Sequence, residues 1–85
     1  MILVTLLKGQ DLTKGQDFLK NGQYHDAVKF FSGIIKTYPK NPDVLNGLAE
    51  GQHRTGDPMT AIENYKKSLA INPKQLSTWI SIGNI

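Results

Sequence analysis

The side chains that most often carry catalysis or bind metals are scarce in this sequence of 85 residues. Cysteine is absent, which excludes thiolate nucleophiles, thiolate metal sites and disulfides. The two histidines, His25 and His53, lie far apart in the sequence, and neither belongs to an H-x-x-x-H or similar ligand pattern. No nucleophile is accompanied by a base and an orienting group, and no glycine-rich loop is suited to a phosphate. We therefore expect no catalytic residue, no metal site, no cofactor and no enzymatic activity.

Charge and hydropathy argue against two further classes of partner. Ten Lys and Arg against seven Asp and Glu give a formal charge of +3, and the basic residues are scattered along the chain. This balance predicts no nucleic-acid partner. The longest apolar run, MILVTLL at residues 1–7, is far shorter than the roughly 20 residues of a membrane span. It also lacks the flanking signals of a secretory leader, so we expect a cytoplasmic protein.

Similar residues recur along the sequence at a fixed separation, which is the separation between Gly22 and Gly56. Internal repetition at such a period indicates stacked supersecondary units that bury their apolar faces against each other. The other matching pairs are Ala27 and Ala61, Val28 and Ile62, Phe31 and Tyr65, Ile35 and Leu69, and Pro39 and Pro73. A third copy begins where Trp79 follows Leu45 at the same offset.

Each unit has the pattern of two helices. Asn41-Pro42 and Asp57-Pro58 each combine a capping side chain with a proline suited to the first helical position. Gly56 supplies the left-handed conformation that closes a helix. The expected helices span residues 10–21, 24–37, 42–55, 58–71 and 75–84. Helical spacing assigns their buried stripes to Phe18, Ala27, Val28, Phe31, Ile34, Ile35, Leu45, Leu48, Ala49, Ala61, Ile62, Tyr65, Ser68 and Leu69.

The second half of each unit carries an alanine four residues before an aromatic residue and a proline eight residues after it. These residues are Ala27, Phe31 and Pro39 in the first unit and Ala61, Tyr65 and Pro73 in the second. Trp79-x-x-Ile82-Gly83 adds the opening of a third unit. Over residues 8–85 the pattern resembles the tetratricopeptide repeat, a helix-turn-helix unit of about 34 residues. The resemblance implies an all-α, right-handed helix-turn-helix repeat solenoid of about five helices.

The resemblance also implies how the chain is divided. The expected divisions are an apolar segment at 1–7, a first repeat at 8–41, a second at 42–75 and the first helix of an incomplete third repeat at 76–85.

The sequence departs from the family pattern at Gln52. This residue stands where the second unit usually has an aromatic residue, and we expect it to loosen that unit. The nearest rival family is the pentatricopeptide repeat, which reads RNA. Its period is about one residue longer, and the Trp-Ile-Gly opening favours the protein-binding family.

Tetratricopeptide arrays hold an extended peptide or a partner helix in a concave groove lined by the leading helix of each unit, so the resemblance implies a protein-binding adaptor. Helical spacing places one stripe of each leading helix opposite the core stripe. The candidate groove residues are Leu12, Gln16, Leu19 and Lys20 in the first unit, Asn46, Glu50, His53 and Arg54 in the second, and Ile80, Ser81 and Asn84 in the third.

One specialisation of the family is a clamp of Lys, Asn and Arg that captures the acidic C-terminus of heat-shock chaperones. Its positions in the first leading helix correspond to Leu12 and Gln16, its position in the second to Gly47, and its positions in the third to Ser77 and Ser81. None of these residues matches the clamp. An anionic chain end requires fixed cations to offset its desolvation. The sequence therefore predicts that an acidic chaperone C-terminus is not the partner.

Two features leave alternatives open. Gly47 and Gly51 lie within one expected helix, where they either admit the backbone of a partner or mark a loose helix. Trp79 falls on a core position of the family pattern, yet the helix that carries it has more apolar residues than one buried stripe needs.

The apolar residues at the two ends of the sequence predict contact between copies of the chain. We expect the helix that carries Trp79, the segment at residues 1–7, or both to support self-association. The alternative function is thus a structural or oligomerisation unit, or a fragment of a longer array.

Overall fold

The computed structural model describes residues 12–85, so the apolar segment at residues 1–7 and the start of the first expected helix lie outside the described residues. Residues 12–20 are helical, and the described part of the chain contains no strand. The helices that follow are α2 at Tyr24–Ile34, α3 at Pro42–Arg54, α4 at Pro58–Ile71 and α5 at Leu76–Gly83. The predicted all-α helical repeat is confirmed.

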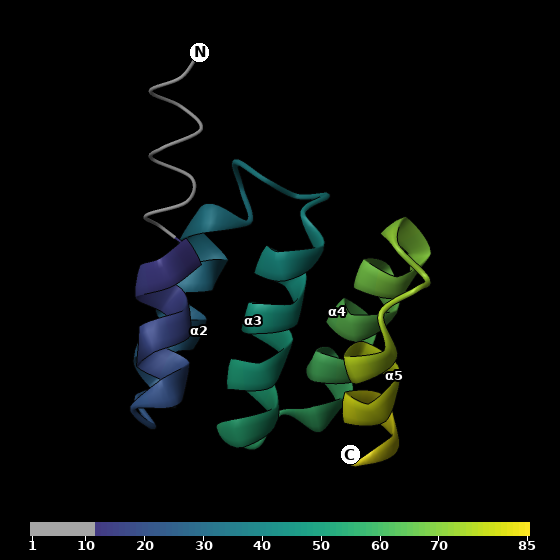
Figure 1. Cartoon of the computed structure of the whole chain (residues 1–85). Coiled ribbons are helices and arrows are strands. Elements are labelled where there is room, and N and C mark those ends of the chain that lie inside the picture. Colours follow the sequence, from purple (N-terminus) through teal and green to yellow (C-terminus); the bar gives the residue numbers. More distant parts are fainter. Residues whose placement is uncertain (1–11) are drawn as a thin grey trace.

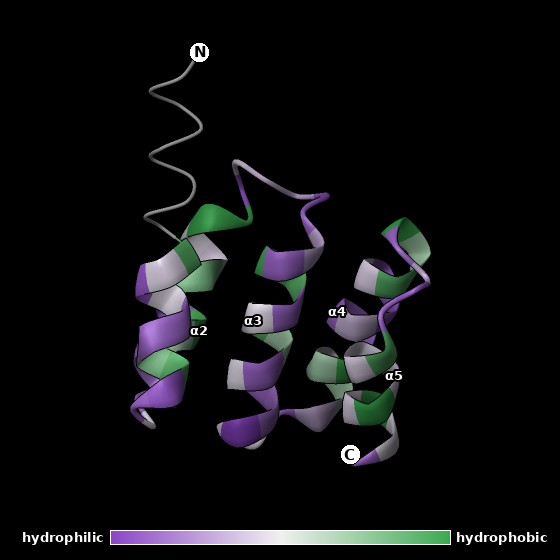
Figure 2. Ribbon diagram, viewed as in Figure 1, coloured by the Kyte–Doolittle hydropathy of each residue, from purple (hydrophilic) through white to green (hydrophobic). Residues whose placement is uncertain are grey.

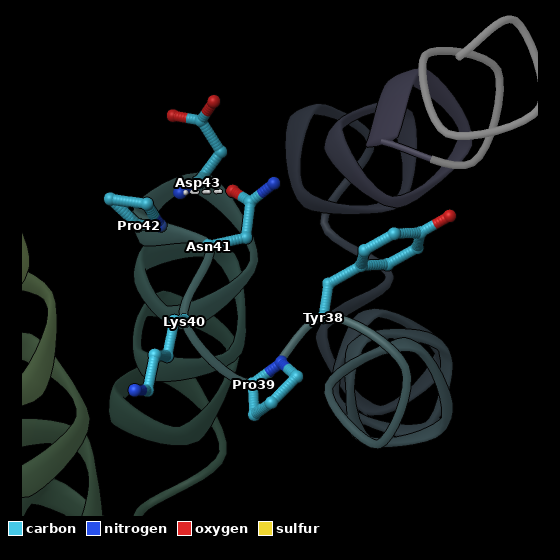
Figure 3. Close-up of a pocket in the computed structure, with 6 residues that line it drawn as sticks. All are labelled: Tyr38, Pro39, Lys40, Asn41, Pro42 and Asp43. Atoms are coloured by element: carbon cyan, nitrogen blue, oxygen red, sulfur yellow. Dashed lines mark hydrogen bonds between the residues drawn. The ribbon is translucent and has the colours of Figure 1, made fainter. Parts of the chain in front are cut away.

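Capping side chains begin α3 and α4 as the sequence predicts. The Oδ1 atom of Asn41 accepts hydrogen bonds from the backbone N–H groups of Asp43 (2.9 Å) and Val44 (3.3 Å). The first of these is drawn in Figure 3. Asp57 Oδ1 accepts from the N–H of Thr60 at 3.4 Å. Each cap satisfies backbone donors that have no partner within the first helical turn.

Two glycines lie where helices end, and a turn closes α2. Gly22 and Gly56 have φ angles of 76° and 93°, the left-handed region in which only glycine avoids a steric penalty. Helix α2 ends at Ile34, earlier than the predicted residue 37. The chain leaves this helix in a turn at residues 35–37, after which the N–H of Tyr38 donates to the carbonyl of Ile34 at 3.0 Å. Pro39 then disfavours helical geometry in Tyr38, so the helix does not resume there.

Helix α3 lies between α2 and α4, and α5 packs against α4 (Figure 1). The predicted core is confirmed at its centre, where Ala27, Phe31, Leu45, Leu48, Ala49, Ala61, Tyr65, Ser68 and Leu69 are all buried. Val28, Ile34, Ile35 and Ile62 of the same stripes are half-buried. The two alanines of the repeat motif have no exposed surface, which permits the close approach of neighbouring helices.

Glycines in the leading helices make room for side chains of α2. A Cβ atom at Gly47 would lie 2.6 Å from Cε2 of Phe31, and one at Gly15 would lie 2.8 Å from Cε1 of the same ring. A Cβ at Gly51 would lie 2.8 Å from Cγ2 of Val28. These glycines therefore serve packing within the chain, because the space beside them is already filled. For Gly47 and Gly51, packing within the chain thus replaces both alternatives that the sequence left open, the approach of a partner and a loose helix.

Gln52 has a partner across the interface between α3 and α4. Its Oε1 atom accepts a hydrogen bond from Nδ2 of Asn64 at 2.8 Å, and Asn64 is only 8% exposed. A satisfied polar pair thus stands where the family pattern has an aromatic residue. The bond links the two helices at the position where the sequence predicts a looser unit.

The expectation that Trp79 fills a core position is wrong. Its side chain is 54% exposed, and its indole N–H donates to the carbonyl of Pro73 at 3.0 Å. Helix α5 packs mainly against α4, so one side of the helix is covered, and the buried residue of that side is Thr78. Figure 2 shows strongly hydrophobic residues on α5. Among these, Leu76 and Ile80 are also exposed.

Candidate functional site

The leading helices line a hollow of about 240 Å³, called here the central hollow. Helical residues 12–20, α3 and α5 form its walls, and α4 contributes one buried aromatic side chain. The lining residues are Gln16, Leu19, Asp43, Asn46, Gly47, Glu50, Tyr65, Ser77, Thr78 and Ser81. A concave site lined by successive leading helices is the arrangement that the repeat pattern predicts.

A second hollow, of about 220 Å³, lies beside the first and is called here the end hollow. It is lined by Glu50, His53, Arg54, Tyr65, Ser81 and Asn84. The two hollows share Glu50, Tyr65 and Ser81, so we treat them together as one groove.

Eight of the eleven candidate residues line this groove. They are Gln16, Leu19, Asn46, Glu50, His53, Arg54, Ser81 and Asn84. The structure places the other three elsewhere: Leu12 packs against the core around Phe31, Lys20 is exposed outside both hollows, and Ile80 is 54% exposed on α5. The part played by any of these residues in binding stays a prediction.

Sequence reasoning misses several lining residues. It indicates a helix start for Asp43 and a core position for Tyr65, and both also face the central hollow. Asp43, Asn46 and Glu50 follow i, i+3, i+7 spacing on α3, so the helical stripe is a sufficient signal for Asp43. No such signal exists for Tyr65, because its stripe correctly indicates burial. The sequence marks Gly47 as a clamp position and as a helix glycine that could admit a partner, marks Ser77 only as a clamp position, and gives no signal for Thr78.

Four of the five positions that correspond to the carboxylate clamp line the central hollow: Gln16, Gly47, Ser77 and Ser81. None of the residues that line this hollow is Lys or Arg, whereas Asp43 and Glu50 are both acidic. Arg54 lines only the end hollow. The hollow therefore has an anionic wall at the place where the clamp would have cations.

A network of hydrogen bonds around Gln75 connects α5 to the helices behind it. The Oε1 atom of Gln75 accepts from Nδ2 of Asn46 at 2.7 Å and from the hydroxyl of Thr78 at 3.3 Å. Its Nε2 atom donates to the hydroxyl of Ser68 at 2.9 Å and to the carbonyl of Asn72 at 2.8 Å. One side chain thus joins α3, α4 and α5, which holds the groove wall formed by α5 in place.

Asn46 has one polar atom without a partner. Its Oδ1 atom is buried and accepts no hydrogen bond within the described residues. The orientation of the amide follows from the network, since the neighbouring Oε1 atom of Gln75 can only accept and must face Nδ2 of Asn46. A buried acceptor without a donor costs about 1–3 kcal/mol. Asn46 lines the central hollow, but its unsatisfied acceptor is buried beneath the surface.

Tyr65 brings a hydroxyl group to the point where the two hollows meet. Burial raises the pKa of this hydroxyl above its ordinary value, while a hydrogen bond with Ser81 lowers it. The carboxylate of Glu50 raises the pKa further and the guanidinium of Arg54 lowers it. The Arg54 guanidinium lies over the ring of Tyr24, 5.6 Å from its centroid. The hydroxyl of Tyr65 is therefore neutral at physiological pH.

Two further hollows lie outside the groove. One, of about 560 Å³, is formed by six consecutive residues, 38–43, that cover the end of the connection from α2 and the first two residues of α3 (Figure 3). Tyr38 is on one side of it and Lys40 and Asp43 extend on the other. The second, of about 370 Å³, lies between α4 and α5 and is lined by Lys66, Leu69, Ala70, Trp79 and Ile82.

Residues 12–85 contain no group of three or more His, Cys, Asp or Glu side chains that is suited to a metal ion. Among the helices of the same residues, none has the length and apolar character needed to cross a membrane.

No protein-family model matches this chain. It is similar to a segment of Hsp70-Hsp90 organizing protein 2 of Arabidopsis thaliana, with 26% identity over 76 residues. The match covers 89% of this chain but 13% of the plant protein. The chain therefore spans about an eighth of the length of this relative.

Proposed function

We propose that this chain is a tetratricopeptide-type protein-interaction module that binds an extended peptide or a partner helix in its groove. The observation that carries the proposal is the convergence of residues from all three leading helices on one concave site. The similarity to a segment of a protein named as an organizer of Hsp70 and Hsp90 supports a role in protein interaction. An adaptor, with no enzymatic activity of its own, fits this class.

The proposal divides the chain as the repeat pattern does, with repeats at residues 8–41 and 42–75 and a leading helix from residue 76. The helix pairs are held together by the buried alanines and aromatic residues of the motif. The groove forms only when three leading helices lie side by side, so binding is a property of the stack and of no single unit.

The relative's name points to chaperones, but the central hollow argues against an acidic chaperone C-terminus as the ligand. Asp43 and Glu50 would repel an anionic chain end, and no Lys or Arg lines the hollow to offset them. In calorimetry, such a peptide should bind no better than its scrambled version. Sequence-dependent micromolar binding would contradict this part of the proposal.

A library of random 12-residue peptides displayed on phage tests the groove itself. Peptides selected on the full chain should lose about tenfold in affinity for the Ser77→Trp variant, because an indole at this exposed position fills the central hollow. Met59→Trp is the matched control, since Met59 is 74% exposed on α4 and lies outside both hollows. The absence of any selected peptide that is sensitive to Ser77→Trp would refute groove binding.

The exposed apolar residues of α5 favour a second candidate function, self-association. Leu76 is 72% exposed, and Trp79 and Ile80 are each 54% exposed. The hollow between α4 and α5 lies beside Trp79 and Ile82. Contiguous apolar surface of this kind is typical of interfaces. An oligomerisation unit would bury this face against a second copy.

Light scattering of the full chain at about 100 µM tests this second candidate. We expect a mass above that of the monomer, which Trp79→Ser reduces, while Met59→Ser leaves it unchanged. A monomeric mass would exclude self-association without affecting the groove proposal, because Trp79 and Met59 line neither hollow of the groove.

A further inference from the structure

We propose that the groove selects a peptide with a basic side chain, lysine or arginine, and holds that side chain in the central hollow beside Asp43 and Glu50. The inference rests on the proposed function and specifies the chemistry of the partner. It applies to a chain whose own net charge is +3, so the selectivity comes from the local distribution of charge.

The two carboxylates share one face of α3. Asp43 and Glu50 are seven residues apart, about two helical turns, and both line the central hollow. Neither carboxylate forms an ion pair within the described residues. The other lining residues are uncharged. The hollow thus concentrates negative charge, and none of its lining residues is basic.

Two basic residues of the leading helices, Arg54 and Lys20, lie outside the lining of the central hollow. Arg54 is one turn from Glu50 on α3, but its guanidinium lies over the ring of Tyr24. It therefore reaches only the end hollow. Lys20, in the first helix, is exposed outside both hollows. A ligand that enters the central hollow must supply the positive charge itself, and an anionic ligand meets two like charges.

The hydrogen-bonding groups of the wall favour the same ligand. Lysine and arginine side chains carry hydrogen-bond donors and no acceptors, and carboxylates accept hydrogen bonds and donate none. Charge-assisted hydrogen bonds to carboxylates are about twice as strong as neutral ones. The wall formed by Asp43 and Glu50 therefore discriminates by both charge and hydrogen-bond polarity.

The test uses phage-selected 12-residue peptides that bind the full chain and lose binding to Ser77→Trp. We expect these peptides to share a Lys or Arg, and its replacement by Gln to weaken binding about tenfold in fluorescence anisotropy. The double variant Asp43→Asn, Glu50→Gln should bind the parent peptide more weakly than the original chain, by a similar factor. It should have no effect on the binding of the Gln-substituted peptide.

The matched control is the double variant Asp26→Asn, Glu63→Gln. Asp26 lies in the first turn of α2, as Asp43 lies in the first turn of α3, and Asp26 and Glu63 are both exposed outside the groove. This control has the same net charge as the double variant Asp43→Asn, Glu50→Gln. Its affinity for the parent peptide should stay within about twofold of that of the original chain.

Three outcomes would overturn the inference. If no peptide is sensitive to Ser77→Trp, the proposed function itself fails. If sensitive peptides lack a basic residue, or bind equally after its replacement by Gln, the function stands and the selectivity is wrong. The peptide substitution requires no variant protein, so this result holds even if the double variant fails to fold. As a final check, Glu50→Lys should prefer a peptide with Glu in place of the basic residue.

Discussion

Phe31 and Tyr65 occupy equivalent positions of the two repeats, yet their surroundings differ. Phe31 is fully buried. Its ring lies against Gly15 and Gly47 so closely that a Cβ atom at either glycine would overlap it. The aromatic ring fills a space that the two leading helices leave empty. The site around Phe31 is closed and apolar, and it contains no side-chain group that requires a hydrogen-bond partner.

The equivalent site around Tyr65 is polar and borders the groove. The positions one repeat after the two glycines hold Ala49 and Ser81. Ala49 packs with Tyr65 in the core, and the Ser81 side chain acts on the Tyr65 hydroxyl and lowers its pKa. Tyr65 is 4% exposed and lines both hollows. A tyrosine at this position requires a partner for its hydroxyl, and α5 provides one.

The comparison teaches that repeat symmetry sets the position of a side chain but leaves its chemistry free. One aromatic position makes a packing centre, and the other joins the core to the groove. Substitutions at the two sites should therefore differ in size and in the property that they change.

The largest effect should come from Phe31→Ala, which we expect to reduce the free energy of unfolding by about 3–5 kcal/mol. The ring is fully buried, and the glycines on either side cannot collapse into the cavity. Urea denaturation monitored by circular dichroism measures the change. Phe31→Leu is the control and should cost less, because it keeps more of the buried volume. A loss below about 1 kcal/mol for Phe31→Ala would contradict the closed packing described above.

Enlarging the alanine of each motif should have the next largest effect. Ala27 and Ala61 have no exposed surface, so Ala27→Leu and Ala61→Leu should each destabilise the protein by about 1–3 kcal/mol through overpacking. Thermal melts of the two variants provide the measurement. Ala70→Leu is the control, since Ala70 is exposed on α4. Unchanged melting temperatures in both core variants would mean that neighbouring helices do not meet at these alanines.

Two glycine substitutions should change the stability of the protein in opposite directions. Gly47→Ala should destabilise the protein by about 1 kcal/mol or more, because overlap with the Phe31 ring outweighs the gain in helix propensity. Gly33→Ala should stabilise it by about 0.5–1 kcal/mol, since a Cβ there meets no atom within 4 Å. Both glycines lie in helices. Urea denaturation of both variants tests the difference, and stabilisation by Gly47→Ala would show that the ring can move aside.

Tyr65→Phe should have a small effect on stability at neutral pH, a loss of about 0.5–1.5 kcal/mol from the polar interaction between its hydroxyl and Ser81. Its effect should appear at alkaline pH. Burial raises the pKa of Tyr65 in the folded state, so above about pH 10 the unfolded chain ionises first and holds fewer protons than the folded chain. Stability contributed by the neutral hydroxyl is thus present below that pH and lost as pH rises through the folded pKa.

The pH dependence separates this effect from simple loss of packing. Urea denaturation of the original chain and of Tyr65→Phe should give a difference in unfolding free energy that shrinks or reverses above about pH 10. Tyr24→Phe is the control, because Tyr24 is half-buried at the edge of α2. A constant difference across this range would contradict the burial of the Tyr65 hydroxyl.

Local residue chemistry determined most of the fold. The caps at Asn41 and Asp57 and the glycines at 22 and 56 act within a few residues of the chain, so their effect can be derived from the sequence alone. The alanine-aromatic motif likewise predicts which stripes are buried. The sequence predicts too late an end for α2, because hydrophobic periodicity continues to Ile35 while the backbone already turns toward Pro39.

Only the tertiary structure decided which side chains share the groove and what charge it has. Helical spacing places Asn46 and Glu50 on one stripe, but the convergence of Gln16, Tyr65 and Ser81 on the same space depends on how the helices stack. Packing also left Trp79 half exposed, since its burial depends on a neighbour on the free side of α5. Periodicity along one chain determines which face of a helix is apolar, whereas a site between helices depends on distances that no single helix contains.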